Sequence, residues 1–175
     1  MTRNLPPKLV VLIGPPGAGK TTVGRELASL LGWQFVDTDT MVEEDAGKPV
    51  AEIFLADGEA AFRERERQVV RRAITQASEA VVALGGGAPM DPQTQLLLPL
   101  DATVFLDVSE AVAIRRVGLA RARPLLAASP RARWRALMAR RRPVYESLAA
   151  QTVPTDDARP RATAEQIAHA LGLTA

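Results

Sequence analysis

One glycine-rich run constrains the fold of this chain more than any other feature. Residues 14–21 read Gly-Pro-Pro-Gly-Ala-Gly-Lys-Thr, after an apolar stretch at residues 9–13 and before a helical pattern at residues 20–31. A run of the form G-x-x-x-x-G-K-[ST] at a strand-to-helix junction is a P-loop, whose backbone N–H groups surround phosphate oxygens. The sequence therefore predicts a bound nucleoside triphosphate, with Lys20 at its β- and γ-phosphates and the Thr21 hydroxyl on Mg²⁺.

Apolar strands alternate with helical patterns along the chain. We expect strands at residues 9–13, 33–36, 80–84 and 102–106, with a weaker one at 151–153. Helical patterns occupy residues 20–31, a broad region at 39–77, and residues 92–97, 110–119, 130–149 and 162–171. This alternation predicts an α/β fold in which helices cover both faces of a parallel sheet. A length of 175 residues suits one domain over residues 1–175.

The composition excludes several kinds of chemistry. The chain has no cysteine, so it has neither disulfides nor a thiolate nucleophile, and its one histidine, His169, lies on an expected surface helix. No apolar run approaches the ~20 residues that span a bilayer, and the N-terminus lacks the apolar core of a secretion signal. We therefore expect a cytoplasmic protein that contacts no membrane.

Arginines gather at residues 63–72 and 131–142, and such clusters can bind nucleic acid. However, the formal net charge is only +2, and Glu64 and Glu66 interleave with the first cluster on a helical pattern. We therefore interpret most of these arginines as solvated helix faces and expect no nucleic-acid partner.

Two carboxylates follow the second expected strand. Asp37 and Asp39 belong at the carboxyl edge of the sheet, where α/β folds bind their ligands. If strand geometry persists there, one side chain faces Mg²⁺ and its waters, and the other takes a proton from an acceptor hydroxyl. The alternative is that an aspartate caps the following helix.

Two further patterns suggest contacts to a second ligand. Arg63 and Glu66 share a helix face, so the carboxylate can hold the guanidinium ready to grip a planar anion. An ordinary surface pair is the alternative, and the spacing alone favours it. The glycine triplet, which comprises Gly85, Gly86 and Gly87, follows the third strand and permits close backbone approach to a ligand, although a plain turn is the alternative.

Two arginine–proline runs complete the pattern. Residues 118–130 interrupt the helical pattern, so we expect a mobile lid whose Arg123 closes over the triphosphate. Arg141 lies two residues before Pro143, where we expect a helix to end near its proline. The alternative is that these arginines only interact favourably with the dipole at the C-terminus of the helix.

In this order, the motifs resemble the shikimate kinase family. The family pattern contains a P-loop, D-[ST]-D, G-E-x-x-F-R-x-x-E, G-G-G, R-P-L-L and R-x-P-[LV]-Y, which match residues 14–21, 37–39, 58–66, 85–87, 123–126 and 141–145. The resemblance implies a P-loop kinase with a five-stranded parallel sheet of order 2-3-1-4-5 flanked by helices, a substrate-binding region at about residues 38–77 and a mobile lid. It also implies a monomer that uses ATP and Mg²⁺ to phosphorylate the 3-hydroxyl of shikimate, on the route to aromatic amino acids.

The resemblance further implies the roles of particular residues. The implied catalytic residues are Lys20, Asp39 and Arg123. The implied nucleotide contacts are Gly14, Gly17, Ala18, Gly19, Lys20, Thr21, Thr22, Arg116, Arg123 and Pro160. The implied shikimate contacts are Asp39, Arg63, Gly85, Gly86, Gly87 and Arg141. Thr21 would ligate Mg²⁺ directly and Asp37 through water, while Glu66 would orient Arg63.

Some departures and alternatives stay open at this point. Pro154 replaces a polar residue of the family pattern beside the fifth strand, so the geometry of the adenine-side loop is open. The run from Arg140 to Arg142 leaves open which arginine faces inward, and the family pattern selects Arg141. Other readings are another small-molecule kinase of this fold, such as a gluconate kinase, and a nucleotide-binding regulator without catalysis.

Overall fold

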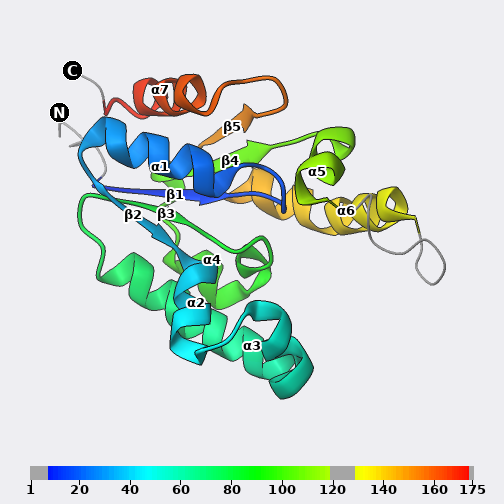
Figure 1. The fold of residues 1–175 in the computed structure, drawn as a ribbon. Helices are drawn as coiled ribbons and strands as arrows, with labels where there is room; N and C mark the ends of the chain where they lie inside the picture. The colour runs from blue at the N-terminus through cyan, green and yellow to red at the C-terminus, as the bar shows by residue number, and fades with distance from the viewer. Residues whose placement is uncertain (1–7, 119–128, 174–175) are drawn as a thin grey trace.

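A parallel sheet with the strand order β2-β3-β1-β4-β5 forms the centre of the molecule (Figure 1). The structure, a computed structural model, describes residues 8–118 and 129–173. The strands are β1 (Leu9–Ile13), β2 (Gln34–Asp37), β3 (Ala80–Ala83), β4 (Thr103–Asp107) and β5 (Gln151–Pro154). β1 pairs with β3 on one side and with β4 on the other. The predicted fold class and strand order are confirmed.

The helices follow the predicted alternation with strands. They are α1 (Lys20–Leu31), α2 (Thr38–Ala46), α3 (Val50–Thr75), α4 (Pro92–Leu97), α5 (Glu110–Val117), α6 (Pro130–Leu148) and α7 (Pro160–Ala170), with short 3₁₀ turns η1 (Ala88–Met90) and η2 (Leu100–Ala102). The broad helical region therefore divides into α2 and α3. Within α3, Gly58 has φ 84° and ψ 168°, a conformation that kinks the helix and that glycine adopts without a Cβ clash.

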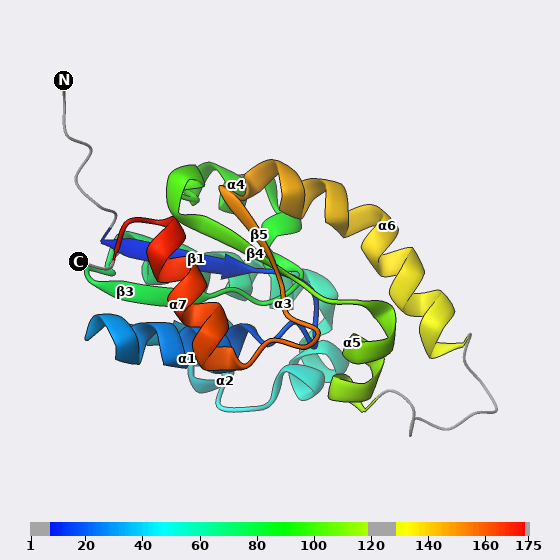
Figure 2. The same ribbon diagram turned by 90° about the horizontal axis from the view of Figure 1, so that it is seen from above.

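The core consists of two apolar layers on opposite faces of the sheet. Along β1, Val10 and Leu12 join the layer that includes residues of α1 and α7, whereas Val11 and Ile13 join the layer that includes residues of α3 and α6. Figures 1 and 2 show α1 and α7 side by side on one face of the sheet. Because side chains alternate along a strand, a nearly continuous apolar run such as β1 buries both faces.

A smaller apolar cluster joins α2 to α3. It consists of Val42, Ile53, Phe62 and Val69, all of them buried. This packing holds α3 against α2 on both sides of Gly58, and α2 itself begins where β2 ends. The expected substrate-binding region is thereby held at the carboxyl edge of the sheet.

The structure corrects one expectation about helix ends. The prediction that a helix ends near Pro143 is wrong, because α6 continues through Pro143 to Leu148. A proline inside a helix removes one backbone hydrogen bond, and here the buried Met138, Tyr145 and Leu148 hold the helix against the sheet on both sides of it.

Pro154 lies at the end of β5, which pairs with β4 alone among the described strands. A proline is tolerated on an edge strand because the ladder does not need its missing N–H. The fifth strand therefore forms as predicted despite this departure from the family pattern. Within the described residues, no helix combines the length and the apolar character needed to cross a membrane.

Candidate active site

The P-loop lies between β1 and the first turn of α1. Gly17 and Gly19 have φ values of 81° and 87°, in the left-handed region that glycine adopts without strain. Gly19 is the N-cap of α1 and has no side chain to occupy the first N–H groups of the helix. These N–H groups and the helix dipole form a site for phosphate oxygens.

Lys20 bends back over this loop. Its Nζ donates to the carbonyl oxygens of Gly14 at 2.8 Å and Pro15 at 3.0 Å. Burial lowers the pKa of Lys20 to about 8, while the charges of Asp39 and Asp37 raise it and that of Arg141 lowers it. The ammonium therefore lies in a poorly solvated position, where an added phosphate charge would interact with it strongly.

Thr21 and Asp37 join the P-loop to the end of β2. The Thr21 hydroxyl donates to Asp37 Oδ2 at 2.7 Å, and Asp37 Oδ1 accepts the Asp39 backbone N–H at 3.1 Å. Asp37 is thus both the N-cap of α2, as the alternative interpretation predicted, and a neighbour of the P-loop. A hydroxyl and a carboxylate oxygen fit the coordination preference of Mg²⁺.

The expected metal site is not a protein cage. Within residues 8–118 and 129–173, no three His, Asp or Glu side chains are grouped so that they alone could hold a metal ion. This is the usual situation for Mg²⁺, which is bound by one or two protein oxygens together with substrate phosphates and water.

Two recesses meet at the P-loop. One of about 240 Å³ is lined by residues that include Lys20, Thr21, Asp37 and Asp39. The other, of about 160 Å³, is lined by Arg116 and Pro160, among others. Gly19 and Thr22 line both, so the two recesses are adjacent and match the phosphate and base ends of a nucleotide. Ala18, which the structure buries fully, lines the second.

Arg116 ties the P-loop to the chain after β5. Its guanidinium donates to the carbonyl oxygens of Gly17 at 3.1 Å and Thr155 at 2.6 Å. Arg116 therefore lies against the second recess, as the resemblance implies, and Pro160 begins α7 on its other side. The described backbone accommodates Pro154 without losing this arrangement.

Asp39 lies in the first turn of α2, and not on a continued strand. Strand geometry ends at Asp37, because Asp37 caps the helix that starts at Thr38. Burial, and next the negative charge of Asp37, raise the pKa of Asp39, whereas Lys20 and Arg63 lower it. A carboxylate with a raised pKa is better suited to take a proton than an ordinary aspartate.

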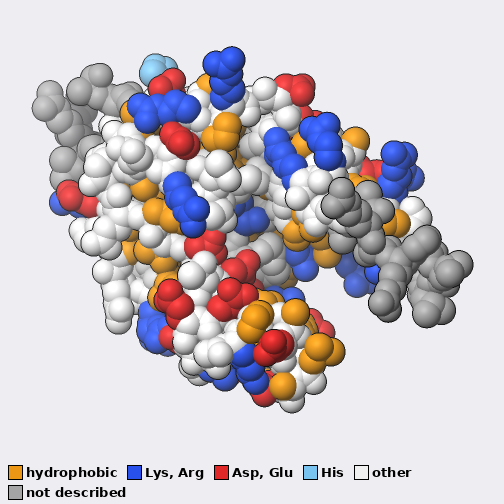
Figure 3. All heavy atoms as spheres, viewed as in Figure 1, with side chains coloured by type: hydrophobic (Ala, Val, Ile, Leu, Met, Phe, Trp, Pro, Cys, Tyr) orange, Lys and Arg blue, Asp and Glu red, His pale blue; other side chains and the backbone are white. Residues whose placement is uncertain are grey.

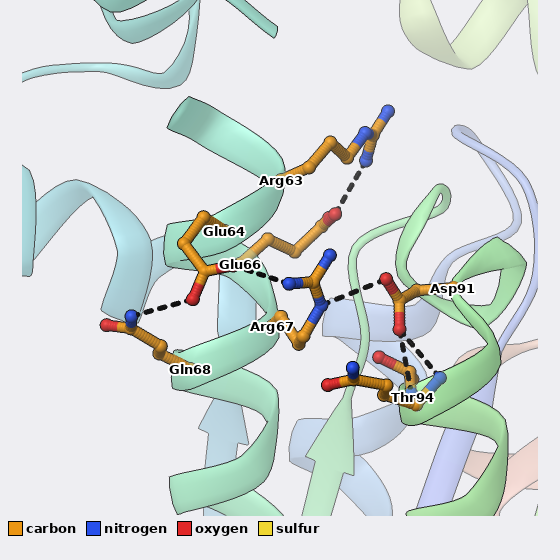
Figure 4. A network of polar contacts seen from close by, with 8 residues as sticks. Arg63, Glu64, Glu66, Arg67, Gln68, Asp91 and Thr94 are labelled. Atoms are coloured by element: carbon orange, nitrogen blue, oxygen red, sulfur yellow. Dashed lines mark hydrogen bonds and ion pairs between the residues drawn. The ribbon is translucent and has the colours of Figure 1, made fainter. Parts of the chain in front are cut away.

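Arg63 and Glu66 form a partly buried pair on α3. Arg63 Nη1 donates to Glu66 Oε2 at 2.6 Å, and Figure 4 shows the two side chains directed toward each other. Only 4% of Glu66 is exposed, so the reading of an ordinary surface pair is wrong. Burial raises the pKa of Glu66, although the hydrogen bond and charge of Arg63 lower it.

Two aromatic rings lie near the Arg63 guanidinium. Sequence reasoning did not single out this contact. Its Cζ lies 5.1 Å from the ring centroid of Phe62 and 6.0 Å from that of Phe54. The rings orient the guanidinium through cation–π contact and keep one side of it dry. The only sequence signal was that Phe62 directly precedes Arg63.

The glycine triplet brings the acceptor-side groups together. A Cβ on Gly85 would clash with the Asp39 carboxylate, and one on Gly87 would lie 2.5 Å from Arg63 Nη1. A Cβ on Gly86 would lie 3.4 Å from Arg141 Nη1. The triplet is therefore a surface against which these side chains pack closely, and the reading of a plain turn is insufficient.

The structure also separates the arginines of α6. Arg141 is directed to Gly86, whereas Arg142 makes two hydrogen bonds of 2.8 Å to the carboxylate of Asp107 at the end of β4. Arg140 is exposed. The selection of Arg141 as the inward arginine thus agrees with the geometry.

One predicted residue cannot be placed. Arg123 and most of the expected lid fall within residues 119–128, outside the described residues.

On the face drawn in Figure 3, acidic side chains gather over the region of α2, and basic ones over the region of α5 and α6. Larger recesses of about 470 and 520 Å³ lie beside β2 and between α3 and α4, but Lys20, Arg63 and Arg141 line neither, so we assign the site by its chemistry.

The comparisons with known proteins agree with this geometry. A family model described as "Shikimate kinase" matches residues 16–172. A shikimate kinase of Thermobifida fusca is 53% identical over 163 residues, which cover 93% of this chain and 94% of the relative. A shikimate kinase of Salinispora arenicola is 50% identical over 158 residues, which cover 90% of this chain and 94% of that relative.

Solved structures show the same similarity. A structure described as shikimate kinase from Acinetobacter baumannii in complex with shikimate has a TM-score of 0.82 and 36% identity, covering 94% of this chain and 91% of that one. A shikimate kinase from Bacteroides thetaiotaomicron also has a TM-score of 0.82, at 31% identity, covering 94% and 98%. Most of the P-loop, from residue 16 onward, lies within the matched range, as do the Arg63–Glu66 pair and the glycine triplet, and the chain belongs to the shikimate kinase family.

Proposed function

We propose that this chain transfers the γ-phosphoryl group of ATP to the 3-hydroxyl of shikimate, giving shikimate 3-phosphate and ADP. In this step the hydroxyl oxygen forms a bond to the γ-phosphorus, the bond from that phosphorus to the ADP oxygen breaks, and the hydroxyl proton leaves. The observation that carries the proposal is the convergence of Asp39, Arg63 and Arg141 on one glycine triplet beside the P-loop recess. A phosphate donor and a small carboxylate-bearing acceptor can therefore occupy one cleft.

The donor half is assigned to the P-loop. The backbone of Gly14, Gly17, Ala18 and Gly19 surrounds the phosphates, with Thr22, Arg116 and Pro160 toward the base. Lys20 neutralises charge on the transferring group, a role that we also assign to Arg123. When bound, Mg²⁺ neutralises phosphate charge, and Thr21 directly and Asp37 through water would hold it.

The acceptor half is assigned to separate elements. Arg63 and Arg141 grip the shikimate carboxylate, because a guanidinium recognises a planar anion with two parallel hydrogen bonds. Glu66 holds Arg63 in place through their bond of 2.6 Å. Asp39 accepts hydrogen bonds from the ring hydroxyls and receives the departing proton, which the raised pKa of this carboxyl supports.

The decisive test is ADP release by the purified protein. We expect release that depends on shikimate, with no comparable release with gluconate, with quinate or without an acceptor. Release with gluconate alone would favour the other small-molecule kinase, and release with none of the acceptors would favour a non-catalytic nucleotide-binding protein.

We also propose that the chain acts as a cytoplasmic monomer without a nucleic-acid partner. Every proposed ligand-binding group lies on one chain, and three of the five arginines of α3, those at positions 63, 67 and 72, are ion-paired with carboxylates. Light scattering after size-exclusion chromatography tests the oligomeric state. Salt-dependent binding to duplex DNA would contradict the absence of a nucleic-acid partner.

A further inference from the structure

Two buried hydroxyl groups hold the backbone of the glycine triplet. The Gly85 N–H donates to Thr38 Oγ1 at 3.0 Å, and the Tyr145 hydroxyl donates to the Gly86 carbonyl oxygen at 2.6 Å. Thr38 is 1% exposed and Tyr145 is not exposed at all. The Thr38 bond is buried and the Tyr145 bond is partly buried, and neither hydroxyl is among the groups assigned above to ligands.

Each hydroxyl belongs to an element that carries an acceptor-side group. Thr38 directly precedes Asp39 at the start of α2. Tyr145 follows Arg141 by four positions on α6, so the two side chains share one face of the helix. The Tyr145 ring packs against Phe105 of β4, with centroids 5.1 Å apart. The triplet is thus tied to Asp39 from one side and to Arg141 from the other.

The other backbone hydrogen bonds of the triplet show which of its N–H groups remain available to a ligand. The carbonyl oxygens of Gly85 and Gly87 accept the N–H groups of Ala88 and Met90, both at 3.0 Å. Across residues 8–118 and 129–173, no hydrogen bond uses the N–H of Gly86 or Gly87. With no partner among the described residues, these two N–H groups can bind oxygen atoms of a ligand.

We propose that Thr38 and Tyr145 are positioning residues for the phosphoryl acceptor, which act through the glycine triplet and touch no ligand themselves. Thr38 sets the distance between the triplet and Asp39, and Tyr145 sets the distance between the triplet and Arg141. This proposal rests on the proposed function. Its physical basis is that the triplet already lies at contact distance from Asp39, Arg63 and Arg141, so a small backbone shift alters all three contacts.

The test uses substitutions that remove only a hydroxyl. Tyr145→Phe and Thr38→Val keep side-chain volume, and Thr38→Ser restores the hydroxyl. A matched control is Thr103→Val, because the buried Thr103 hydroxyl donates to the Pro99 carbonyl oxygen at 2.7 Å at the opposite end of β4. The readouts are kcat, the KM values for shikimate and ATP, and the free energy of unfolding in urea.

We expect Tyr145→Phe and Thr38→Val each to lower kcat/KM for shikimate ~5- to 30-fold, the effect of one lost buried hydrogen bond. The KM for ATP should stay within about twofold, since the P-loop does not depend on these bonds. Thr38→Ser should return toward the wild-type value, and Thr103→Val should lose stability while keeping wild-type kinetics.

Three outcomes would overturn the proposal. One is wild-type kinetics in both variants, another is an equal loss for shikimate and ATP, and the third is a Thr38→Ser enzyme as impaired as Thr38→Val. If the Tyr145→Phe protein fails to fold, the comparison of Thr38→Val with Thr38→Ser tests the proposal by itself. Failure of the proposed function itself is distinct, because the wild-type protein would then release no shikimate-dependent ADP.

Discussion

At the scale of single residues, the charges of the site act on the pKa values of Lys20 and Asp39. Lys20, Asp37, Asp39 and Arg141 lie close enough for each aspartate to raise the pKa of Lys20 and for Arg141 to lower it. Burial outweighs these neighbours and leaves Lys20 with a pKa of about 8. Lys20, the residue that we propose to contact the phosphates, therefore titrates near physiological pH.

This titration predicts a pH-dependent affinity for ATP. Bound triphosphate stabilises the ammonium form and raises its pKa, so binding takes up protons above pH 8 and affinity falls as pH rises through about 8. Calorimetry in buffers of different ionisation enthalpy measures the proton uptake. Lys20→Arg, which stays charged, is the control, and an identical pH dependence in that variant would contradict the assignment.

Asp39 predicts a change in turnover. Asp39→Asn keeps the shape of the side chain but removes its capacity to take a proton, so we expect kcat to fall by ~10²- to 10⁴-fold. The KM for ATP should change little. Asp45→Asn on the same helix is the control, since Asp45 pairs with Arg72 on α3, away from the P-loop. A fully active Asp39→Asn enzyme would remove this carboxylate from the mechanism.

Arg63 predicts a change in acceptor binding. Arg63→Ala leaves the buried Glu66 without its partner and removes one grip on the shikimate carboxylate, so we expect binding to weaken by roughly 2–5 kcal/mol. Titration calorimetry measures this directly. Arg71→Ala, an exposed position on the same helix, should leave the affinity unchanged. Equal affinities in the two variants would place Arg63 outside the acceptor site.

At the scale of elements, α6 has to present Arg141 to the triplet although it contains Pro143. The neighbouring Arg142 bonds the end of β4 through Asp107, and the Thr155 hydroxyl and N–H donate to the Asp107 carbonyl oxygen at 3.0 and 2.9 Å. The end of β4 thus connects α6 with the chain after β5. Figure 4 shows a second connection between elements, in which Arg67 of α3 bonds Asp91, the N-cap of α4.

The Arg142–Asp107 pair predicts a stability effect. Arg142→Gln should lower the free energy of unfolding by ~0.5–1.5 kcal/mol, a value kept small because 37% of the Arg142 side chain is exposed and water screens the pair. Urea denaturation measures it. The exposed neighbour Arg140 provides the control, and an Arg140→Gln protein of equal stability to Arg142→Gln would show that the pair contributes nothing.

At the scale of the whole molecule, one sheet carries two apolar layers and both halves of the cleft. The P-loop and the triplet lie beyond the carboxyl ends of β1 and β3, and Asp37 is the last residue of β2. These three strands are adjacent in the sheet. Donor and acceptor groups meet at this edge because parallel strands place all their carboxyl ends together.

We predict that the chain is a single domain and unfolds in one cooperative transition. Trp33 packs against one apolar layer and Trp134 against both, and these are the two tryptophans of the chain. In Trp33→Phe and Trp134→Phe proteins, the remaining fluorescence signal and far-ultraviolet circular dichroism should change at the same urea concentration. Separate midpoints would divide the chain into independent units.

Local sequence was sufficient to predict most of the helices and strands. The five strands lie within one or two residues of their predicted positions. The signal is clearest for β1, β3 and β4, which are short and mostly apolar runs, and weakest for β5, which has the sequence Gln-Thr-Val-Pro. The spacing of Arg63 and Glu66 was correctly read as a pair, but it could not distinguish an exposed pair from a buried one. The Glu66 carboxylate lies beside Gly85 of the triplet, which is far away in the sequence.

By itself, the sequence determined the strand–helix alternation and the P-loop, because these depend on residue types at short, regular spacings. The residues proposed to bind the acceptor were indicated only by the resemblance of several motifs to one family. Only the tertiary structure decided that Arg141 and not Arg142 faces the triplet, since the rotation of α6 is set by its packing on the sheet. It also decided that Thr38 and Tyr145 hold the triplet, across separations of 47 and 59 residues. Contacts at that range arise when the sheet brings its carboxyl ends together, and no local pattern encodes them.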